Sequence, residues 1–494
     1  MNQMNWLIVY PEIFLLLMTS VVALIGVNAS TARLNLTFWV AEISLLVFGF
    51  MHLQELQTGA AVYGIQRMVV ADPMGHLLAL SAALATAITL GYARPYLASR
   101  DLLKGEFLSL AMFSLLGISV MVSANNFLVV YVGLELMSLS LYALTALRRD
   151  HAVSTEAAMK YFVLGALASG FLLYGLSMMY GATGTLDIPF AFDAIHKGIE
   201  HPYVVLTFGL VFIVAGLAFK LGLAPFHMWV PDVYQGAPTA VTLLISGAPK
   251  LAAFGITIRI LVEGLSGLAT DWQQMLVVLS VVSMTLGNLA AIAQTNLKRL
   301  LAYSAIAQLG FMLLGLTPTV IDLSTASAAN GYSSAMFYII TYVLTTLGTF
   351  GLIMYLSRHG FESEEISDLA GLAKRAPWVA GVMSIFMFSL AGIPPLVGFY
   401  AKFAVLQALV STNNSGYITL AVVAVLLSLI GAYYYLRIVK TMFFDEPVDP
   451  TPIRGDTGTA VLLAVNGLAA LAFGLMPDGL MSLCRDAVLK ALNS

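Results

Sequence analysis

Residues 219–241 read FKLGLAPFHMWVPDVYQGAPTAV, an apolar segment that contains three prolines. Proline removes a backbone donor and clashes with the preceding turn, so we expect an interrupted helix here. A second segment, residues 389–403, reads SLAGIPPLVGFYAKF and contains two adjacent prolines. The motifs at 222–225 and 392–395 both match G-[LI]-x-P, which favours two repeats with one interrupted helix in each. The alternative is that proline and glycine are simply common in membrane helices.

The composition around these segments is that of a membrane protein. The chain has 494 residues, of which 60% are hydrophobic and 10% are charged, whereas a soluble domain carries about 25% charged residues. The net charge of -3 gives no electrostatic reason to expect nucleic-acid binding. The single cysteine, Cys484, cannot form an intrachain disulfide, an iron–sulfur cluster or a cysteine-based zinc site. We therefore expect a polytopic all-α membrane protein with no redox centre, metal or cofactor of its own.

Windows of about 20 apolar residues predict the membrane-spanning helices. Fourteen such segments lie near residues 5–27, 35–54, 74–93, 107–123, 125–147, 158–182, 203–236, 240–263, 272–293, 299–317, 330–357, 377–410, 417–444 and 457–477. The seventh and the twelfth are the two interrupted segments.

Lysines and arginines concentrate on one set of alternate loops and flanks, which the positive-inside rule assigns to the cytoplasm. That set contains Arg33, Arg94, Arg100, Lys104, Arg148, Arg149, Lys298, Arg299, Arg358, Lys374, Arg375, Arg437, Lys440 and Arg454. The opposite set contains only Arg67, Lys197, Arg485 and Lys490. The asymmetry predicts that both termini lie on the outer, periplasmic side.

Five ionisable residues lie inside the apolar segments: Glu135, Lys160, Lys220, Lys250 and Lys402. A charge at the centre of a bilayer costs about 2.5–3.5 kcal/mol on insertion scales, so such residues are candidates for function. Because most of them are lysines in a chain with little other charge, they point to the movement of protons or cations through the membrane.

Glu135 and Lys220 are both expected to be buried, and opposite buried charges usually pair. One interpretation is a static ion pair that fixes helix packing. The functional interpretation is that movement of Glu135 toward or away from Lys220 switches the lysine between holding and releasing a proton.

The remaining candidates differ in the strength of their signal. Lys250 lies among small residues that permit close helix approach, and Lys402 follows the second interruption with no carboxylate nearby in sequence. His227 lies inside the first interruption, where a relay and a structural role are equally expected. Lys160 follows Glu156 by four residues, the spacing of an ordinary helical ion pair.

Three other charged residues give weaker signals. Arg259 is ambiguous, because its long side chain could extend outward to the interface. Glu12 and Glu42 lie in the first two helices, outside the proposed repeats, and we interpret them as peripheral.

The segments LELMSLSLYAL (134–144), QTNLKRLLAYSAIAQLGF (294–311) and the two interrupted segments resemble the antiporter-like membrane subunits of bacterial proton-translocating NADH:quinone oxidoreductase, or respiratory complex I. This family also includes subunits of cation/proton antiporters. The resemblance spans residues 107–444. A lysine at position 402 argues against the subunit M type, and the short C-terminal end argues against the subunit L type, so the subunit N type is favoured.

The resemblance implies an N-terminal three-helix segment (1–106), two inverted five-helix repeats (107–263 and 272–444) and a C-terminal helix and tail (457–494). Position by position, it assigns proton translocation to Glu135, Lys220, Lys250 and Lys402, with His227 as a possible relay and Lys160 as a weak candidate. NADH, FMN, iron–sulfur clusters and quinone are expected in partner subunits. The partners are expected to be other membrane and peripheral subunits, especially neighbouring antiporter-like ones, in the bacterial inner membrane.

One position departs from the family pattern. Many relatives carry a histidine in the tenth-helix motif where this chain has Gln308. Glutamine cannot take up a proton near neutral pH, so we expect water or a hydroxyl, such as that of Tyr303 or Ser304, to bridge there.

The sequence therefore predicts a subunit that moves protons while other subunits carry out NADH oxidation and quinone reduction. The closest alternative is a subunit of a sodium/proton antiporter that uses the same residues. A second alternative is a structural membrane subunit whose lysines are locked in static pairs.

Overall fold

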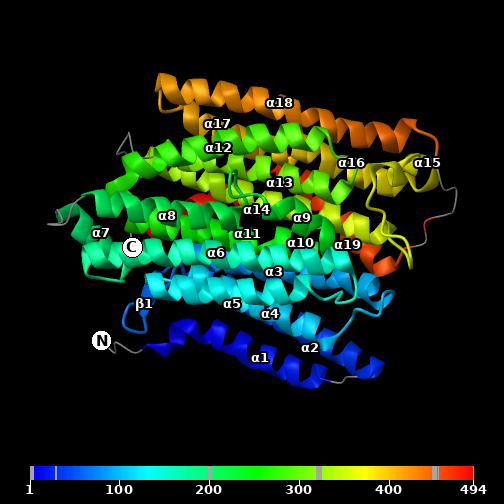
Figure 1. Ribbon diagram of the computed structural model, residues 1–494, viewed down its shortest axis with the longest axis horizontal. Coiled ribbons are helices and arrows are strands. Elements are labelled where there is room, and N and C mark those ends of the chain that lie inside the picture. Colours follow the sequence, from blue (N-terminus) through cyan, green and yellow to red (C-terminus); the bar gives the residue numbers. More distant parts are fainter. Residues whose placement is uncertain are drawn as a thin grey trace.

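The computed structural model describes residues 5–27, 30–197, 203–318, 325–447, 453 and 455–492, and within these ranges the chain is almost entirely helical (Figure 1). The first helices are α1 (Tyr10–Gly26), α2 (Thr31–Thr58), α3 (Pro73–Ala98), α4 (Gly105–Val122), α5 (Phe127–Thr145), α6 (Ala152–Thr183), α7 (Ile188–Lys197), α8 (Tyr203–Leu221), α9 (Trp229–Gly236), α10 (Thr239–Ser246) and α11 (Ala248–Thr257). The later ones are α12 (Ala269–Ile292), α13 (Leu297–Leu313), α14 (Thr325–Leu356), α15 (Leu372–Arg375), α16 (Pro377–Ala391), α17 (Val397–Val410), α18 (Ser415–Phe444), α19 (Thr457–Leu475) and α20 (Asp478–Leu492).

Short elements complete the regular structure of these ranges. They are the antiparallel hairpin of β1 (Val62–Gly64) and β2 (Val69–Ala71), the 3-10 helices η1 (Trp6–Val9), η3 (Ser266–Leu268), η4 (Leu314–Leu316) and η5 (Ile366–Leu369), and the π-helix η2 (Ile258–Gly264).

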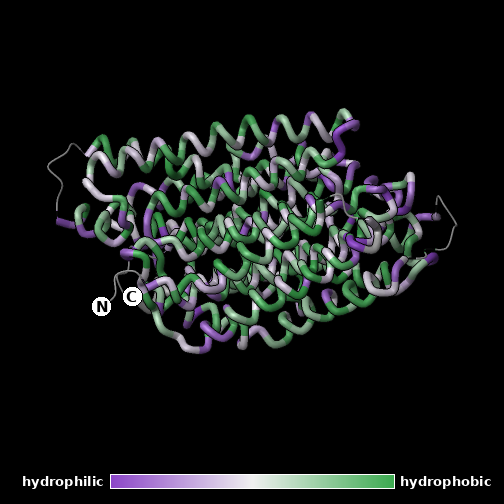
Figure 2. The backbone as a smooth tube through the Cα atoms, turned by 90° about the horizontal axis from the view of Figure 1, so that it is seen from below, coloured by the Kyte–Doolittle hydropathy of each residue, from purple (hydrophilic) through white to green (hydrophobic). Residues whose placement is uncertain are grey.

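The long helices lie side by side along the long axis of the molecule, with α1 and α2 at one edge and α18 at the opposite edge (Figure 1). Hydrophilic residues gather at the two ends of the bundle, and the residues of its middle are mostly hydrophobic (Figure 2). In the described residues, 13 helices are long and apolar enough to cross a membrane. They fall in thirteen of the fourteen predicted segments, and the two shorter apolar helices α16 and α17 occupy the twelfth. The prediction of an all-α polytopic membrane protein is confirmed.

The chain leaves the helical conformation within both proline-containing segments. Residues 222–228 separate α8 from α9, and residues 392–396 separate α16 from α17. Gly222 (φ 83°) and Gly392 (φ 85°) follow the last residues of α8 and α16 in the left-handed conformation. Glycine adopts this conformation without a steric penalty, and its N–H closes the last turn of the helix. Each helix therefore ends with backbone carbonyls directed toward the gap.

The eighth predicted segment is also irregular. The chain turns at Gly247 between α10 and α11, and α11 continues directly into η2. Nearly all of this stretch is buried among the other helices, with Val262 and Glu263 partly exposed. Lys250 therefore lies in the first turn of α11, and Arg259 lies in the π-helix that extends it.

Small residues allow the central helices to approach closely, as is usual where lipid provides no hydrophobic drive for helix association. A Cβ added to Gly117 of α4 would lie 2.5 Å from the backbone nitrogen of Met137 in α5. A Cβ added to Gly175 of α6 would lie 2.6 Å from the carbonyl oxygen of Gly209 in α8. These contacts hold α5 and α8, which carry Glu135 and Lys220, at backbone-contact distance from their neighbours.

A charged cluster ties the last turn of α3 to the loop that follows α14. The Arg100 Nε donates to Glu362 Oε1 at 3.0 Å, and the Tyr96 hydroxyl donates to Glu362 Oε2 at 2.7 Å. Arg148, just after α5, lies 3.3 Å from the same carboxylate. Burial alone would raise the pKa of Glu362, but the hydrogen bonds from Arg100 and Tyr96 hold that pKa below its ordinary value.

This lowered pKa predicts a loss of stability in acid. A carboxyl group whose pKa is lower in the folded state stabilises the fold above its unfolded pKa of about 4.3, and this contribution is lost as the pH falls through the folded pKa. We expect the Glu362→Gln variant to show a smaller fall in melting temperature than the wild type when the pH is lowered below about 4. Thermal melts across pH test this, with the exposed Glu446→Gln as control. Equal slopes for Glu362→Gln and wild type would contradict it.

Candidate functional site

Lys250 lies against the end of α8. Its Nζ donates hydrogen bonds to the carbonyl oxygens of Lys220 at 3.2 Å and Leu221 at 2.9 Å. The same nitrogen lies 5.2 Å from the centre of the Trp229 ring, a cation–π distance. Lys250 is 1% exposed. Its ammonium is thus held by backbone carbonyls at the negative end of a helix dipole.

Lys402 occupies the corresponding position at the second gap. Its Nζ donates to the carbonyl oxygens of Leu390 at 3.0 Å and Ala391 at 3.2 Å, and to the Ser428 hydroxyl at 2.8 Å. Each lysine therefore bonds the carbonyls of the two residues that precede the left-handed glycine, Gly222 in one case and Gly392 in the other. The two sites have the same hydrogen-bond pattern although the lysines lie on different elements. Lys402 is on α17, directly after the second gap, whereas Lys250 is on α11, beyond α9 and α10.

Lys220 and Glu135 are close in the fold without direct contact. The Lys220 Nζ donates to the hydroxyl of Ser138 at 2.8 Å, one turn after Glu135 on α5. The Oε1 atom of Glu135 is buried and has no hydrogen-bond partner. In the described residues, no carboxylate lies within 4.0 Å of the Nζ of Lys220, Lys250 or Lys402. Ser138 therefore takes the place that the sequence suggested for the carboxylate.

Gln308 lies in a network of hydroxyl groups beside Lys402. Its Nε2 donates to the carbonyl of Leu390 at 2.8 Å, the same oxygen that Lys402 bonds, and to the Tyr435 hydroxyl at 3.0 Å. The Tyr338 hydroxyl donates to its Oε1. Ser304 lies 2.5 Å from the Tyr435 hydroxyl. Hydroxyl groups thus surround Gln308, the residue that stands where many relatives have a histidine.

Sequence reasoning named Ser304 but not Tyr338, Tyr435 or Ser428, because these lie on α14 and α18, far from Gln308 in the chain. Tyr303, the other hydroxyl suggested by the sequence, lies instead 6.0 Å from the Arg299 guanidinium.

Lys160 belongs to a separate ionic cluster around Asp232, in the first turn of α9. Its Nζ lies 2.8 Å from Glu156 and 2.7 Å from Asp232, and Arg299 also contacts Asp232 at 2.7 Å. The predicted i,i+4 pair with Glu156 is confirmed. The side chain of Lys160 is 42% exposed and pairs with two carboxylates, whereas the Nζ atoms of the other three lysines have no carboxylate within 4.0 Å among the described residues.

His227 lies in the non-helical residues 222–228 and is half-buried. Its Nδ1 is buried without a hydrogen-bond partner. The ring can therefore accept or donate one further hydrogen bond inside the gap.

The side chain of Arg259 does not extend outward to the interface, which the sequence left open. The residue is 1% exposed. Its guanidinium lies 2.7 Å from Asp72, at the start of α3, and 2.9 Å from Glu263 in η2. It also donates to the Val122 carbonyl at 3.0 Å. A guanidinium with two carboxylates and a carbonyl as partners is stable inside the bundle and has no need to reach the interface.

We expect the Arg259→Met variant to lose about 3–5 kcal/mol of stability, because it leaves buried carboxylates without a countercharge. The measurement is the thermal stability of the assembled membrane complex and its content of this subunit. The exposed Lys440→Met variant is the control. A melting temperature equal to that of the wild type would show that the carboxylates find other partners.

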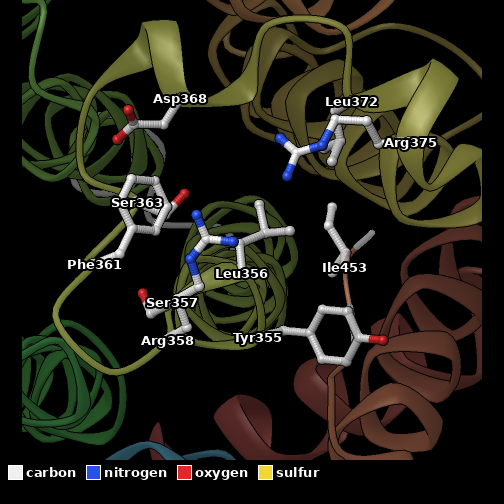
Figure 3. A pocket seen from close by; sticks show the side chains of 10 residues that line it. All are labelled: Tyr355, Leu356, Ser357, Arg358, Phe361, Ser363, Asp368, Leu372, Arg375 and Ile453. Atoms are coloured by element: carbon white, nitrogen blue, oxygen red, sulfur yellow. The ribbon is translucent and has the colours of Figure 1, made fainter. Parts of the chain in front are cut away.

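A solvent-facing pocket of about 160 Å³ lies elsewhere, between the end of α14 and α15 (Figure 3). The side chains of Arg358, Asp368 and Arg375 surround it. None of the predicted site residues lines it. Within the described part of the chain, no group of three or more histidine, cysteine or acidic side chains could hold a metal ion.

Known proteins resemble this chain in both sequence and fold. A family model described as "NADH:quinone oxidoreductase/Mrp antiporter, TM" matches residues 124–430. A protein named NADH-quinone oxidoreductase subunit N from Herminiimonas arsenicoxydans is 58% identical, with 100% of each chain covered. The chain belongs to the NADH-quinone oxidoreductase subunit N family. The resemblance read from the sequence is confirmed.

Further relatives extend the match. The subunit N of Polaromonas naphthalenivorans is 56% identical, with 100% of this chain and 99% of the relative covered. A chain of respiratory complex I from Thermus thermophilus superposes with a TM-score of 0.79 at 30% identity, covering 96% of this chain and 98% of that one. A chain of the Mrp complex from Dietzia sp. shares the fold, with a TM-score of 0.85 at 22% identity over 99% and 100% of the two chains. The chain is thus an antiporter-like membrane subunit of a multi-subunit enzyme complex.

Proposed function

We propose that this chain translocates protons across the bacterial inner membrane, driven by NADH oxidation and quinone reduction in other subunits. The observation that carries the proposal is the pair of equivalent lysine sites: Lys250 is buried, Lys402 is half-buried, and each Nζ bonds carbonyls at an interrupted helix. A lysine is held there by backbone oxygens and has no permanent countercharge, so it can gain and lose a proton without breaking an ion pair.

The likeness of the two sites supports the division into repeats. We assign one repeat to residues 107–263 and the other to 272–444, with the N-terminal helices (1–106) and the C-terminal segment (457–494) outside them. The lysine and arginine asymmetry supports outer positions for both termini; residues 1–4, 493–494 and Arg454 lie outside the described residues.

In the proposed mechanism, a change in a neighbouring subunit moves the Glu135 carboxylate relative to Lys220. Because the Lys220 Nζ bonds Ser138, one turn from Glu135 on α5, a rotation of either side chain changes the separation of the two charges. Two unit charges about 10 Å apart at an effective dielectric near 20 interact by about 1.7 kcal/mol, roughly one pKa unit. Such a change shifts the balance between the protonated and the neutral form of Lys220. A larger shift follows when water enters or leaves the gap.

The proton then passes from Lys220 toward Lys250, which already bonds the Lys220 carbonyl. From there it passes toward Lys402, with the hydroxyls around Gln308 in place of a titratable side chain. His227, with its unpartnered Nδ1, is a relay candidate inside the first gap. Lys160 is the weakest candidate, because its two carboxylate partners hold it as a static pair.

NADH, FMN, iron–sulfur clusters and quinone are assigned to partner subunits. Purification with its partners tests this function: NADH-oxidising subunits should accompany the chain, and the complex in liposomes should pump protons when given NADH and quinone. The similarity to the Mrp fold keeps a sodium/proton antiporter as the second candidate. Sodium transport by the chain in liposomes without any redox partner would favour that candidate.

A further inference from the structure

A second group of buried titratable side chains lies outside the lysine sites, where α1, α2, α3 and α4 meet. The Nδ1 atoms of His52 and His76 lie 2.9 Å apart, and both rings are buried. The other ring nitrogen of His52, Nε2, lies 3.9 Å from Glu12 Oε1. The same Glu12 oxygen accepts a hydrogen bond from Ser119 of α4 at 2.7 Å.

The contact between Glu12 and His52 is too long for a direct hydrogen bond. The Nε2 atom of His52 is buried without a hydrogen-bond partner, although His52 is only 3% exposed. A small cavity of about 10 Å³ lies among Glu12, His52, His76 and Asp72, room for a single water molecule. One water molecule in this cavity could bridge Glu12 and His52 and would give the unpaired Nε2 atom of His52 a hydrogen bond.

The group continues in two directions. Toward the end of α2, the Tyr10 hydroxyl donates to Glu55 at 3.1 Å, and Glu55 is only partly buried, so this side reaches the surface of the bundle. Toward the interior, Asp72 lies at the start of α3, one turn before His76, and pairs with Arg259. Arg259 lies in η2, the continuation of the helix that begins beside Lys250.

We propose that Glu12, His52 and His76 form a proton relay that connects the surface near Glu55 with the helix that carries Lys250. In one step, the His76 Nδ1–H bond breaks as its proton moves to His52 Nδ1. The His52 Nε2–H bond breaks as the bridging water passes a proton to the Glu12 carboxylate. One proton is thereby transferred from His76 to Glu12, His52 and His76 both end neutral, and Glu12 releases the proton toward the outer surface near Glu55.

The charged and titratable neighbours take part in this step. The His52–His76 hydrogen bond needs one donor and one acceptor nitrogen, so a shift of the shared proton, with the second transfer at His52 Nε2, changes His52 to its other tautomer and changes the charge of His76. Protonated His76 would be attracted to the Asp72 carboxylate, which pairs with Arg259 and accepts a hydrogen bond from the Gly75 N–H. A change in charge at His76 therefore alters the pairing that anchors η2, and with it the helix of Lys250.

The relay rests on the proposed proton-pumping function, so the test compares variants of both sites in the assembled complex. Glu12→Gln and His52→Gln keep the size and polarity of the side chains but cannot carry a proton in this way. We expect each to lower the rate of NADH-driven proton pumping in liposomes by about tenfold or more, within the range that general acid–base groups supply. Glu12→Asp should restore at least about half of the wild-type rate. Glu42→Gln, on the same N-terminal helices, is the matched control and should pump as the wild type does.

The outcomes separate the two proposals. If Lys220→Ala fails to pump while Glu12→Gln pumps at the wild-type rate, the relay is wrong and the proposed function stands. If Glu12→Asp pumps no better than Glu12→Gln in complexes of normal subunit content, Glu12 has a packing role and the relay is again wrong. If neither Lys220→Ala nor Glu12→Gln pumps less than the wild type, the proposed function fails and the relay with it.

Discussion

Replacing Lys220 by alanine is expected to lower NADH-driven proton pumping by about 10²-fold, the lower end of what a positioned acid–base group contributes. The variant removes the ammonium that bonds Ser138 but leaves the Lys220 carbonyl, and with it one of the two backbone partners of Lys250. The fold of the gap should therefore survive. The measurement is proton uptake per NADH oxidised by the assembled complex in liposomes.

Two further variants make the Lys220 result specific. Lys440→Ala removes a lysine whose side chain is 62% exposed at the end of α18 and should pump normally. Ser138→Ala removes only the hydroxyl partner and should lower pumping less than Lys220→Ala does. Wild-type pumping by Lys220→Ala in a complex of normal composition would remove Lys220 from the proton path.

Replacing Lys402 by methionine is expected to have an effect of similar size, about 10²-fold. Methionine fills a comparable volume but gives no donor to the carbonyls of Leu390 and Ala391. The proton that reaches the second gap would then have no acceptor among the neighbouring groups, since Gln308 and the tyrosines do not take up protons near neutral pH. Proton pumping by the assembled complex is again the measurement.

The Lys402→Arg variant separates a proton carrier from a helix cap. Arginine can donate to the same carbonyls but does not release a proton in a protein. If Lys402 carries protons, the arginine variant should pump as poorly as the methionine variant while keeping normal thermal stability. If Lys402 only caps α16, the arginine variant should pump like the wild type.

The features that could be predicted from the sequence are local ones. Apolar segment length gives the spanning helices, because a bilayer fixes the number of residues needed to cross it. The G-[LI]-x-P motifs predict interruptions near 222–225 and 392–395, because glycine and proline act on the backbone at their own positions. Lys220 and Lys402 could be placed beside these interruptions, because they lie in the same two segments of the sequence.

The partners of those lysines could not be predicted, because they depend on how helices pack. Nothing near Lys250 in the sequence indicates that it bonds the carbonyl of Leu221 at the end of α8. Asp72 and Arg259 are separated by 187 positions and meet only in the folded bundle. Glu12, which the sequence suggested to be peripheral, lies in the buried histidine cluster for the same reason.

The two gaps differ in one respect that follows from the carbonyl of Leu390. This oxygen accepts a hydrogen bond from Lys402 and another from Gln308, whereas the lysine-bonded carbonyls at the end of α8 have Lys250 as their side-chain donor. If Lys402 moves away, the amide of Gln308 still bonds the Leu390 carbonyl and only the Ala391 carbonyl loses its side-chain donor, whereas a departing Lys250 leaves both of its carbonyls without one. Leaving a buried polar group unsatisfied costs about 1–3 kcal/mol. Lys402 can therefore leave the end of α16 at a lower free-energy cost than Lys250 can leave the end of α8. The neutral amide of Gln308 keeps the Leu390 carbonyl hydrogen-bonded while the lysine is away.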